Sequence, residues 1–202
     1  MRFFRTPAIL PIIYPSLLWK INTAGKDLYL TFDDGPVPGP TEFVLETLKA
    51  SNINATFFCI GDNVRKNPDI FKKVVDARHV IANHTFDHMN GWKASASEYV
   101  RNTELCQTLL PKKRLFRPPF GRITRSQISS LSDYKIVMWD VLTFDYDRSL
   151  DSEKCLRGSL KAVRPGSIIV FHDSVKAEKN VTYVLPRFID SCLSNGYSFH
   201  VL

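Results

Sequence analysis

One stretch decides how this chain folds: Leu28-Tyr29-Leu30-Thr31-Phe32-Asp33-Asp34-Gly35-Pro36. Its first five residues are mostly apolar or β-branched, and such a run is typical of a β-strand covered on both faces, as in a parallel sheet wrapped by helices. Gly35 and Pro36 are turn residues that end it. We therefore expect a buried parallel strand with Asp33 and Asp34 just beyond its carboxyl end.

The same pattern recurs along the chain, and the segments between the apolar runs have helical periodicity. The expected strands are Leu28–Phe32, Ala55–Ile60, His79–Ala82, Leu115–Arg117, Lys135–Trp139, Ser167–Phe171 and Tyr197–Val201. The expected helices are Thr41–Ala50, Pro68–Arg78, Ala96–Leu110, Arg125–Leu131, Ser152–Val163 and Val181–Ser194. Strands that alternate with helices predict an α/β fold, either a seven-stranded parallel βα barrel or an open sheet.

Three residues indicate helix boundaries. Pro40 suits a first helical turn, Asn67 followed by proline suits a cap, and Gly196 suits a helix stop.

The composition is that of an ordinary soluble domain. The chain has 202 residues, of which 44% are hydrophobic and 23% charged, so it can bury a sizeable core as one globular unit. Its formal charge of +7 would favour an anionic polymer, an acidic membrane surface or nucleic acid nearby. The basic residues are spread out, and the densest run, Lys112–Arg114, is expected to be a solvated loop. We expect no nucleic-acid partner.

Residues 1–25 are expected to form an apolar arm, packed on or flanking a catalytic domain of residues 26–202. The apolar run Ala8–Trp19 is interrupted by Pro11 and Pro15 and is too short for a membrane-spanning helix. Its resemblance to a secretory signal peptide is superficial, because no convincing small-x-small cleavage site follows the run. A cytoplasmic or membrane-peripheral location is therefore favoured, and basic residues around the run leave weak binding to a membrane surface open.

The four cysteines have none of the paired spacings of a zinc site. We expect them to be reduced core residues, although three disulfide pairings are formally possible. They are Cys59, Cys106, Cys155 and Cys192.

Ionisable side chains follow the carboxyl ends of the expected strands. In a parallel barrel these ends open on one face, where the active site of such a fold is built. The residues are Asp33, Asp34, His84, His88, Arg117, Asp140, Asp145 and His172.

Two short motifs predict a metal site. Adjacent carboxylates leave the chain in different directions, so one of Asp33 and Asp34 can bind a cation while the other faces a water molecule. His84 and His88 are four residues apart, which places both imidazoles on one side of a helical turn. A surface Asp-Asp-Gly turn and a solvated histidine pair are the ordinary alternatives. Together, two imidazoles and a carboxylate leave open metal positions, as a catalytic site requires.

These groups fit the hydrolysis of an acyl group. A carboxylate can activate water, a cation can polarise the carbonyl, and a separate acid can protonate the leaving nitrogen. His172 is the natural acid, and a structural histidine in a loop is the alternative.

On these motifs, the chain resembles the polysaccharide deacetylase family, carbohydrate esterase family 4, which shares the NodB-like domain of nodulation chitooligosaccharide deacetylases. The resemblance runs from about Leu28 to Leu202 and implies a distorted seven-stranded βα barrel. Five ordered motifs carry it: Thr31-Phe32-Asp33-Asp34-Gly35-Pro36, His84-Thr85-Phe86-Asp87-His88, Arg117-Pro118-Pro119-Phe120-Gly121, the aspartate Asp145, and Phe171-His172-Asp173.

The resemblance implies that Asp33 is the general base and that Asp34, His84 and His88 bind one divalent metal. It also implies that Arg117 orients Asp33. Zinc is the first expectation for the metal, and cobalt, nickel or iron(II) also suit these ligands.

The resemblance further implies that His172 is the general acid and that Asp145 holds its proton and raises its pKa. The backbone N–H of Phe120 would help stabilise the oxyanion. Tyr146 stands where the family has tryptophan, and Val170 where it has leucine. Both positions shape the pocket for the acyl methyl group, so they leave the acyl group open.

We therefore expect a hydrolase that removes N-acetyl groups from an amino-sugar polymer or oligomer, peptidoglycan-like or chitin-like. Two alternatives stay open: a deacylase of a lipid-linked sugar at a membrane, and a non-catalytic glycan-binding domain. The oligomeric state is undetermined. For Asp62, Asp147 and Trp92 we weigh contacts with sugar against structural roles, and for Trp92 we favour core packing. His79 and His200 are expected to be core or edge residues.

Overall fold

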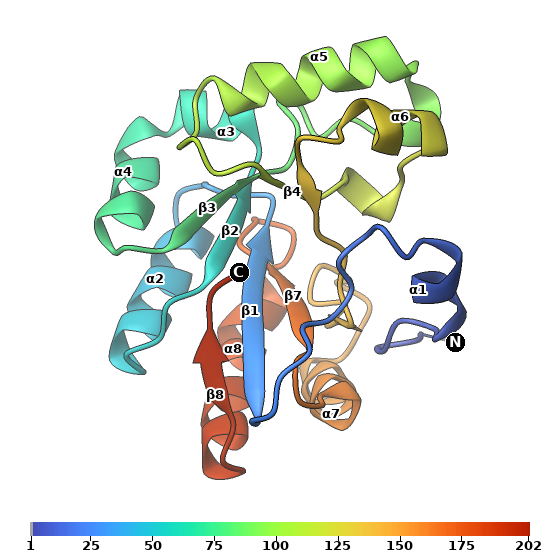
Figure 1. Cartoon of the computed structure of the whole chain (residues 1–202). Coiled ribbons are helices and arrows are strands. Elements are labelled where there is room, and N and C mark those ends of the chain that lie inside the picture. The colour runs from blue at the N-terminus through green and yellow to red at the C-terminus, as the bar shows by residue number, and fades with distance from the viewer. Residues whose placement is uncertain (1) are drawn as a thin grey trace.

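The computed structural model describes residues 2–202 and shows a parallel sheet wrapped by helices (Figure 1). The strands are β1 Asp27–Asp33, β2 Thr56–Cys59, β3 Val80–Asn83, β4 Leu115–Phe116, β5 Lys135–Ile136, β6 Val141–Leu142, β7 Ile168–His172 and β8 Ser198–His200. The helices are α1 Ile9–Ile13, α2 Pro40–Ala50, α3 Gly61–Lys66, α4 Pro68–Asp76, α5 Ala96–Gln107, α6 Arg125–Ser130, α7 Ser152–Ala162 and α8 Glu178–Ser194, with short 3₁₀ turns η1 Gly91–Lys93 and η2 Pro119–Gly121. The prediction of a distorted parallel βα barrel is confirmed.

The sheet is curled because one segment joins its two edges. The strand order is β5-β4-β3-β2-β1-β7-β6, with β8 pairing with the first half of β1. The Val137 N–H donates to the Phe116 carbonyl of β4 at 2.8 Å, and three residues later the Asp140 N–H donates to the Ile168 carbonyl of β7 at 3.0 Å. The prediction of a single strand Lys135–Trp139 is therefore wrong, because the chain exchanges β4 for β7 as its partner and forms β5 and β6 instead.

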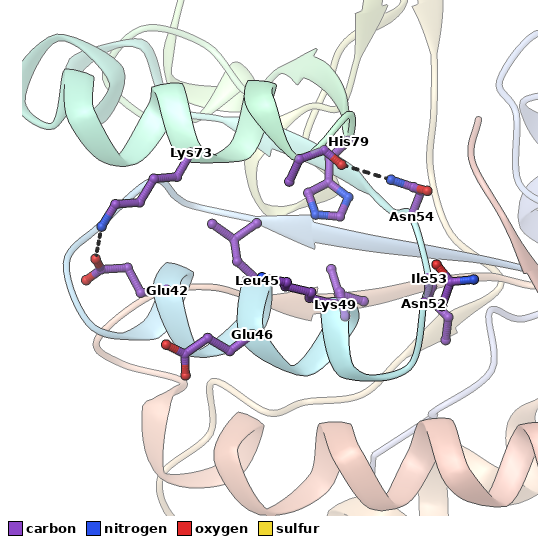
Figure 2. A pocket seen from close by; sticks show the side chains of 11 residues that line it. Glu42, Leu45, Glu46, Lys49, Asn52, Ile53, Asn54, Lys73 and His79 are labelled. Carbon is purple, nitrogen blue, oxygen red and sulfur yellow. Dashed lines mark hydrogen bonds and ion pairs between the residues drawn. The ribbon is translucent and has the colours of Figure 1, made fainter.

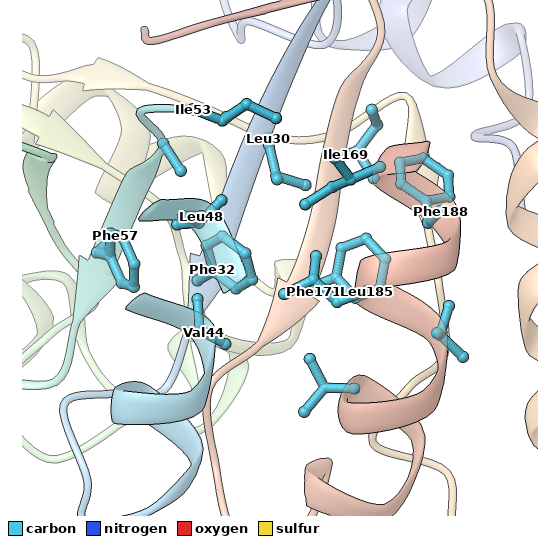
Figure 3. Close-up of a cluster of buried hydrophobic side chains, with 14 of the residues drawn as sticks. Leu30, Phe32, Val44, Leu48, Ile53, Phe57, Ile169, Phe171, Leu185 and Phe188 are labelled. Carbon is cyan, nitrogen blue, oxygen red and sulfur yellow. The ribbon is translucent and has the colours of Figure 1, made fainter. Parts of the chain in front are cut away.

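Successive side chains of β1 point to opposite faces of the sheet, so those that pack in the core are separated from those that reach the candidate site. Leu30 and Phe32 point outward into the main core, where they pack with apolar side chains of α2, β7 and α8 (Figure 3). Thr31 and Asp33 point to the other side, toward the barrel interior, where both contact Arg117. Since successive side chains of a strand face opposite sides, an apolar run can end in one inward carboxylate without disturbing the core.

The N-terminal arm fills the gap between β5 and the start of β7. The Leu18 N–H donates to the Ile136 carbonyl, and the Met138 N–H donates to the Leu18 carbonyl. Farther along, the Ile21 N–H donates to the Gly166 carbonyl. The arm thus supplies backbone partners to the barrel wall. Across residues 2–202, we find no helix with both the length and the apolar character needed to traverse a bilayer.

The six expected helices are present, with ends within three residues of those predicted, while α1 and α3 were not expected. Pro40 and Pro68 each open a helix, and Gly196, at φ 76°, follows the end of α8. Asn67 holds the N-cap position predicted for it, but its side chain donates to the carbonyls of Pro36 and Asn63 and accepts no hydrogen bond from the helix. All four cysteines are free and buried, as expected.

Candidate active site

Three potential metal ligands meet beyond the carboxyl ends of β1 and β3. The ligand atoms of Asp34, His84 and His88 lie within 4.8 Å of one another. Nε2 of His88 is 3.2 Å from Oδ1 of Asp34, and Nε2 of His84 is 3.6 Å from the same oxygen. His84 is buried, whereas Asp34 and His88 are partly open to a cavity. The three side chains therefore converge with one side left accessible.

The protonation of this group suits a divalent metal. Nδ1 of His84 donates to the Arg117 carbonyl at 2.8 Å, which turns Nε2 toward Asp34. Burial lowers the pKa of His84 to about 4, so its imidazole is neutral near pH 7. Burial opposes ionisation of Asp34, but the hydrogen bond from His88 and the neighbouring histidine charges hold the pKa of Asp34 well below its ordinary value. Imidazole nitrogens and an ionised carboxylate fit zinc with open positions.

The loop that carries the two histidines is not helical, so the interpretation of their spacing as a helical turn is wrong. Thr85 and His88 have φ of 63° and 61°, in the left-handed region. The loop is held by side chains: the Phe86 N–H donates to Asn102 Oδ1 at 2.8 Å, and the Met89 N–H donates to Thr85 Oγ1 at 2.9 Å. The histidines converge because the loop folds back on itself between them.

Backbone strain is concentrated around this site. Asp34, His88 and Phe120 all have positive φ, at 83°, 61° and 60°. Residues other than glycine seldom adopt this region, and when they do, the surrounding structure must hold them there. The three strained residues come from three separate loops and line one cavity. The strained backbone at these three residues lowers the stability of the fold, and the surrounding structure holds the residues in their orientation.

Asp33 is fixed by a buried guanidinium. Nη1 of Arg117 donates to Asp33 Oδ1 at 2.6 Å and to Thr31 Oγ1 at 2.8 Å. Its Nε and Nη2 donate to the carbonyls of Val137 and Met138. Arg117 has no exposed surface, so its charge is neutralised only from within the barrel. The carboxylate of Asp33 is held in one orientation at the edge of the cavity.

On the opposite side of the cavity, His172 is paired with a buried carboxylate. Nδ1 of His172 lies 2.7 Å from Asp145 Oδ1, and the His172 N–H donates to Asp145 Oδ2 at 2.7 Å. Burial by itself lowers the pKa of His172, but the charge and hydrogen bond of Asp145 outweigh burial and raise it to about 9. The imidazole is therefore protonated at neutral pH, and its ring stands edge-on to Tyr146 with centroids 4.9 Å apart.

The turn after β1 is held by Asp173, which sequence reasoning left without a role. Asp173 accepts hydrogen bonds from the Gly35 N–H at 3.0 Å and from the Thr41 hydroxyl at 2.7 Å. Burial raises the pKa of Asp173 to about 8. A Cβ at Gly35 would lie 1.9 Å from an Asp173 oxygen, so only glycine fits this approach. The contact fixes the turn that carries Asp34.

One cavity of about 570 Å³ joins these groups. The expected site residues on its wall are Asp33, Asp34, His84, His88, Phe120, Tyr146, Val170 and His172, and Arg117 and Asp145 lie buried behind it. Sequence reasoning missed five further wall residues: Pro118, Arg122, Trp139, Leu142 and Lys176. Arg122 and Lys176 closely follow recognised motifs, which is the one signal that could have indicated them. Trp139 and Leu142 depend on the switch from β5 to β6, which has no local signature.

The placement of Asp140 on the active face is wrong. Its carboxylate pairs with Arg164 at 2.6 Å and accepts a hydrogen bond from the Ser167 hydroxyl at 2.7 Å. Arg164 and Ser167 precede β7, at the opposite end from His172. Asp140 lies between β5 and β6 and not at the end of a strand. Its contacts with Arg164 and Ser167 therefore join this segment to the start of β7, where the barrel closes.

The remaining candidates lie off the cavity wall. Asp62 pairs with basic residues of its own helix, Asp147 pairs with an arginine of the arm, and neither lines the cavity. Trp92 is 66% exposed, so the expectation of core packing is wrong. His79 is buried and accepts a hydrogen bond from a backbone N–H, and His200 is exposed at the β8 edge, consistent with their expected structural places.

A second cavity, of about 490 Å³, lies between α2 and α4 (Figure 2). It contains the ion pair of Glu42 with Lys73 and the imidazole of His79, whose pKa burial lowers to about 4. It lacks the metal-binding group found at the carboxyl ends of the strands, as far as residues 2–202 show. The two cavities have comparable volumes, but only the one at the carboxyl ends of the strands contains potential metal ligands among the described residues. That cavity is the candidate active site.

Residues 20–139 match the family model described as polysaccharide deacetylase, which is more than half of the chain. The chain belongs to the polysaccharide deacetylase family. It is 34% identical to a peptidoglycan-N-acetylglucosamine deacetylase of Bacillus cereus in an alignment that covers 73% of this chain. It is 33% identical to a chitooligosaccharide deacetylase of a Bradyrhizobium species, and that alignment also covers 73% of this chain. The alignments cover 56% and 71% of those proteins.

Among solved structures, a peptidoglycan N-acetylglucosamine deacetylase superposes on this family member with a TM-score of 0.89 at 28% identity. The match covers 95% of this chain and 94% of the other. The family resemblance and the barrel expected from it are both confirmed, and the match includes most of the arm as well as the barrel.

Proposed function

We propose that this protein is a metal-dependent hydrolase that removes N-acetyl groups from an amino-sugar polymer or oligomer and releases acetate. One observation carries the proposal: the carboxylate of Asp33 and the protonated imidazole of His172 line the same cavity as the Asp34, His84 and His88 group. The names of the related deacetylases agree with this chemistry.

The residues supply a balanced reaction. A divalent ion held by Asp34, His84 and His88 would polarise the acetamide carbonyl, with zinc as first choice and cobalt, nickel or iron(II) as alternatives. Asp33, oriented by its arginine partner, takes a proton from the attacking water. His172 donates its proton to the sugar nitrogen as the carbon–nitrogen bond breaks, which yields acetate and a free amine.

Two further groups serve the acyl part of the substrate. The backbone N–H of Phe120 donates a hydrogen bond to the developing oxyanion, since its left-handed conformation is held at the cavity wall. Tyr146, Leu142 and Val170 form an apolar wall beside His172, and Trp139 lies on the same wall. This wall accommodates the acetyl methyl group.

Acetate release tests the proposal. Purified protein loaded with zinc should release acetate from chitooligosaccharides or peptidoglycan fragments. The variant Asp33→Asn should keep its metal and lose roughly 10²–10⁴-fold in rate. Asp69→Asn, at an exposed position of α4, is the matched control. No release from any acetylated glycan, including xylan, contradicts the proposal, and glycan binding without release at any metal loading supports the non-catalytic alternative.

A second candidate, a deacylase of lipid-linked sugars, is favoured by the arm. An apolar hollow of about 380 Å³ between arm and barrel shares Phe120 and Trp139 with the catalytic cavity. Phe3, Ile9 and Ile12 on the arm are 63%, 55% and 72% exposed. Cosedimentation with anionic lipid vesicles that is lost in the Ile9→Ser, Ile12→Ser double variant supports this candidate. The double variant keeps the backbone contacts of the arm, and absence of vesicle binding by the unaltered protein removes the candidate.

A further inference from the structure

Two cationic side chains on the cavity wall have no part in the proposed reaction. Arg122 follows η2 and Lys176 follows β7, and both are exposed. In residues 2–202, neither has a carboxylate oxygen within 4.0 Å, whereas other arginines such as Arg65, Arg114 and Arg164 are paired. These two charges are therefore available to a ligand.

Aromatic rings hold both cations in place. The Arg122 guanidinium lies 4.9 Å from the ring centre of Trp92 and 5.9 Å from that of Phe120. The Lys176 ammonium lies 5.1 Å from the ring centre of Tyr146. Contact with a ring face restrains a cation but uses few of its N–H donors, so these donors stay free for hydrogen bonds. The exposed Trp92 thereby gains a function: it supports Arg122.

The cations stand on two sides of the reacting groups. The ring of Phe120, beside Arg122, stacks edge-on to His88 at 4.5 Å, on the metal-binding side. The ring of Tyr146, beside Lys176, stacks edge-on to His172 at 4.9 Å, on the acid side. When the acetamido group of a sugar reaches the reacting groups, the next sugar on one side of it would lie toward Arg122 and the next sugar on the other side toward Lys176.

The charges deeper in the cavity compensate each other. Asp33 is paired with Arg117, and Asp145 with His172. Asp34 faces imidazoles and, in the proposed enzyme, a divalent cation. Arg122 and Lys176 therefore add positive charge that nothing else in the site balances, and a concave site with such an excess attracts anions.

We propose that the substrate is a glycan whose sugars carry carboxylates next to the N-acetylated residue, and that Arg122 and Lys176 bind those carboxylates. This inference rests on the proposed deacetylase function and narrows its substrate class. A carboxylate-bearing amino-sugar strand, as in peptidoglycan whose peptide stems have been removed, is preferred over a neutral strand such as chitin. The guanidinium of Arg122 binds a carboxylate through two parallel hydrogen bonds, while Lys176 acts as a point charge.

The test compares kcat/KM for deacetylation of a peptidoglycan-derived tetrasaccharide with free carboxylates and of the same tetrasaccharide after reduction of its carboxylates to alcohols. The unaltered protein should prefer the carboxylate form. Arg122→Gln and Lys176→Gln should each reduce that preference about tenfold, mainly through KM, because each removes a hydrogen bond between charged groups. Raising the salt concentration should reduce the preference as well.

Arg125→Gln and Lys179→Gln are matched controls, since both cations are exposed and lie outside the cavity wall. They should leave the preference as it is. Equal kcat/KM for the two tetrasaccharides, or an undiminished preference in the Arg122→Gln, Lys176→Gln double variant, overturns the inference.

A binding measurement separates this inference from the proposed function. If no tetrasaccharide is deacetylated, the proposed activity fails, but calorimetric titration of the zinc-loaded protein with the two tetrasaccharides still decides the inference. Tighter binding of the carboxylate form that weakens about tenfold in each variant supports it. Equal binding of both forms overturns it.

Discussion

His84 and His172 line one cavity, the first buried and the second 12% exposed, and their pKa values move in opposite directions. Burial lowers the pKa of His84 to about 4, whereas burial is outweighed at His172 and the pKa rises to about 9. The partner of Nδ1 differs: a backbone carbonyl of Arg117 for His84 and the carboxylate of Asp145 for His172. The difference teaches that the hydrogen-bond partner of Nδ1, more than burial, decides whether a histidine is neutral or protonated at neutral pH, and so whether it suits the proposed role of ligand or of acid.

The largest expected effect comes from exchanging the two histidines for glutamine. His84→Gln should lose both bound metal and activity, since it removes a neutral nitrogen ligand. His172→Gln should keep its metal and lose roughly 10²–10⁴-fold in kcat, because it removes only the acid. Metal analysis beside acetate release distinguishes the two. If His172→Gln also loses its metal, the division of the cavity into a ligand side and an acid side is wrong.

The next effect is expected from Asp145→Asn, which gives His172 a neutral partner like that of His84. The pKa of His172 should then fall from about 9 toward or below its ordinary value of 6.5. The alkaline limb of the pH–rate profile should move to lower pH, and the rate at pH 8 should fall about 10- to 100-fold. An NMR titration of the His172 ring gives the pKa directly. An unchanged alkaline limb would show that another group sets it.

Stability should depend on pH through the same two rings when the metal is removed by chelation. His172, with a folded pKa of about 9, stabilises the fold fully below pH 6.5, and this contribution is lost as the pH rises through 9. His84, with a folded pKa of about 4, lowers stability as the pH falls from 6.5 through 4.

The comparison with Asp145→Asn isolates the His172 contribution to stability. The melting temperature of the unaltered protein should exceed that of the variant by a few degrees at pH 6, and the gap should narrow toward pH 10. Calorimetric scans across this range measure it. A gap that widens with pH contradicts the raised pKa of His172.

The smallest effect is expected at the acyl wall beside His172. Tyr146→Trp and Val170→Leu restore the residues that the family resemblance implies, and both fill the proposed methyl pocket. Val170→Leu should reduce activity on an N-propionyl substrate relative to N-acetyl by roughly tenfold, since one methylene in such a pocket has an effect of that size. Relative kcat/KM for the two acyl groups is the measurement. An unchanged ratio places the acyl group elsewhere in the cavity.

Most of the barrel could be predicted from local pattern. The apolar run before Asp33 is a strand because it is buried on both sides, and that signal is contained within five residues. The switch between β5 and β6 could not be predicted, because the chain there changes its hydrogen-bond partner from β4 to β7 without a change in residue type.

The sequence by itself determined the order of six helices and of most strands, and most of the residues at the ends of the inner strands, since these follow from periodicity and position along the chain. Only the tertiary structure decided which charges meet. Asp140 and Asp145 both follow the fifth expected strand, yet Arg164 binds one at the barrel closure and His172 binds the other at the cavity. Such pairings join residues from distant parts of the chain, and no local pattern specifies them.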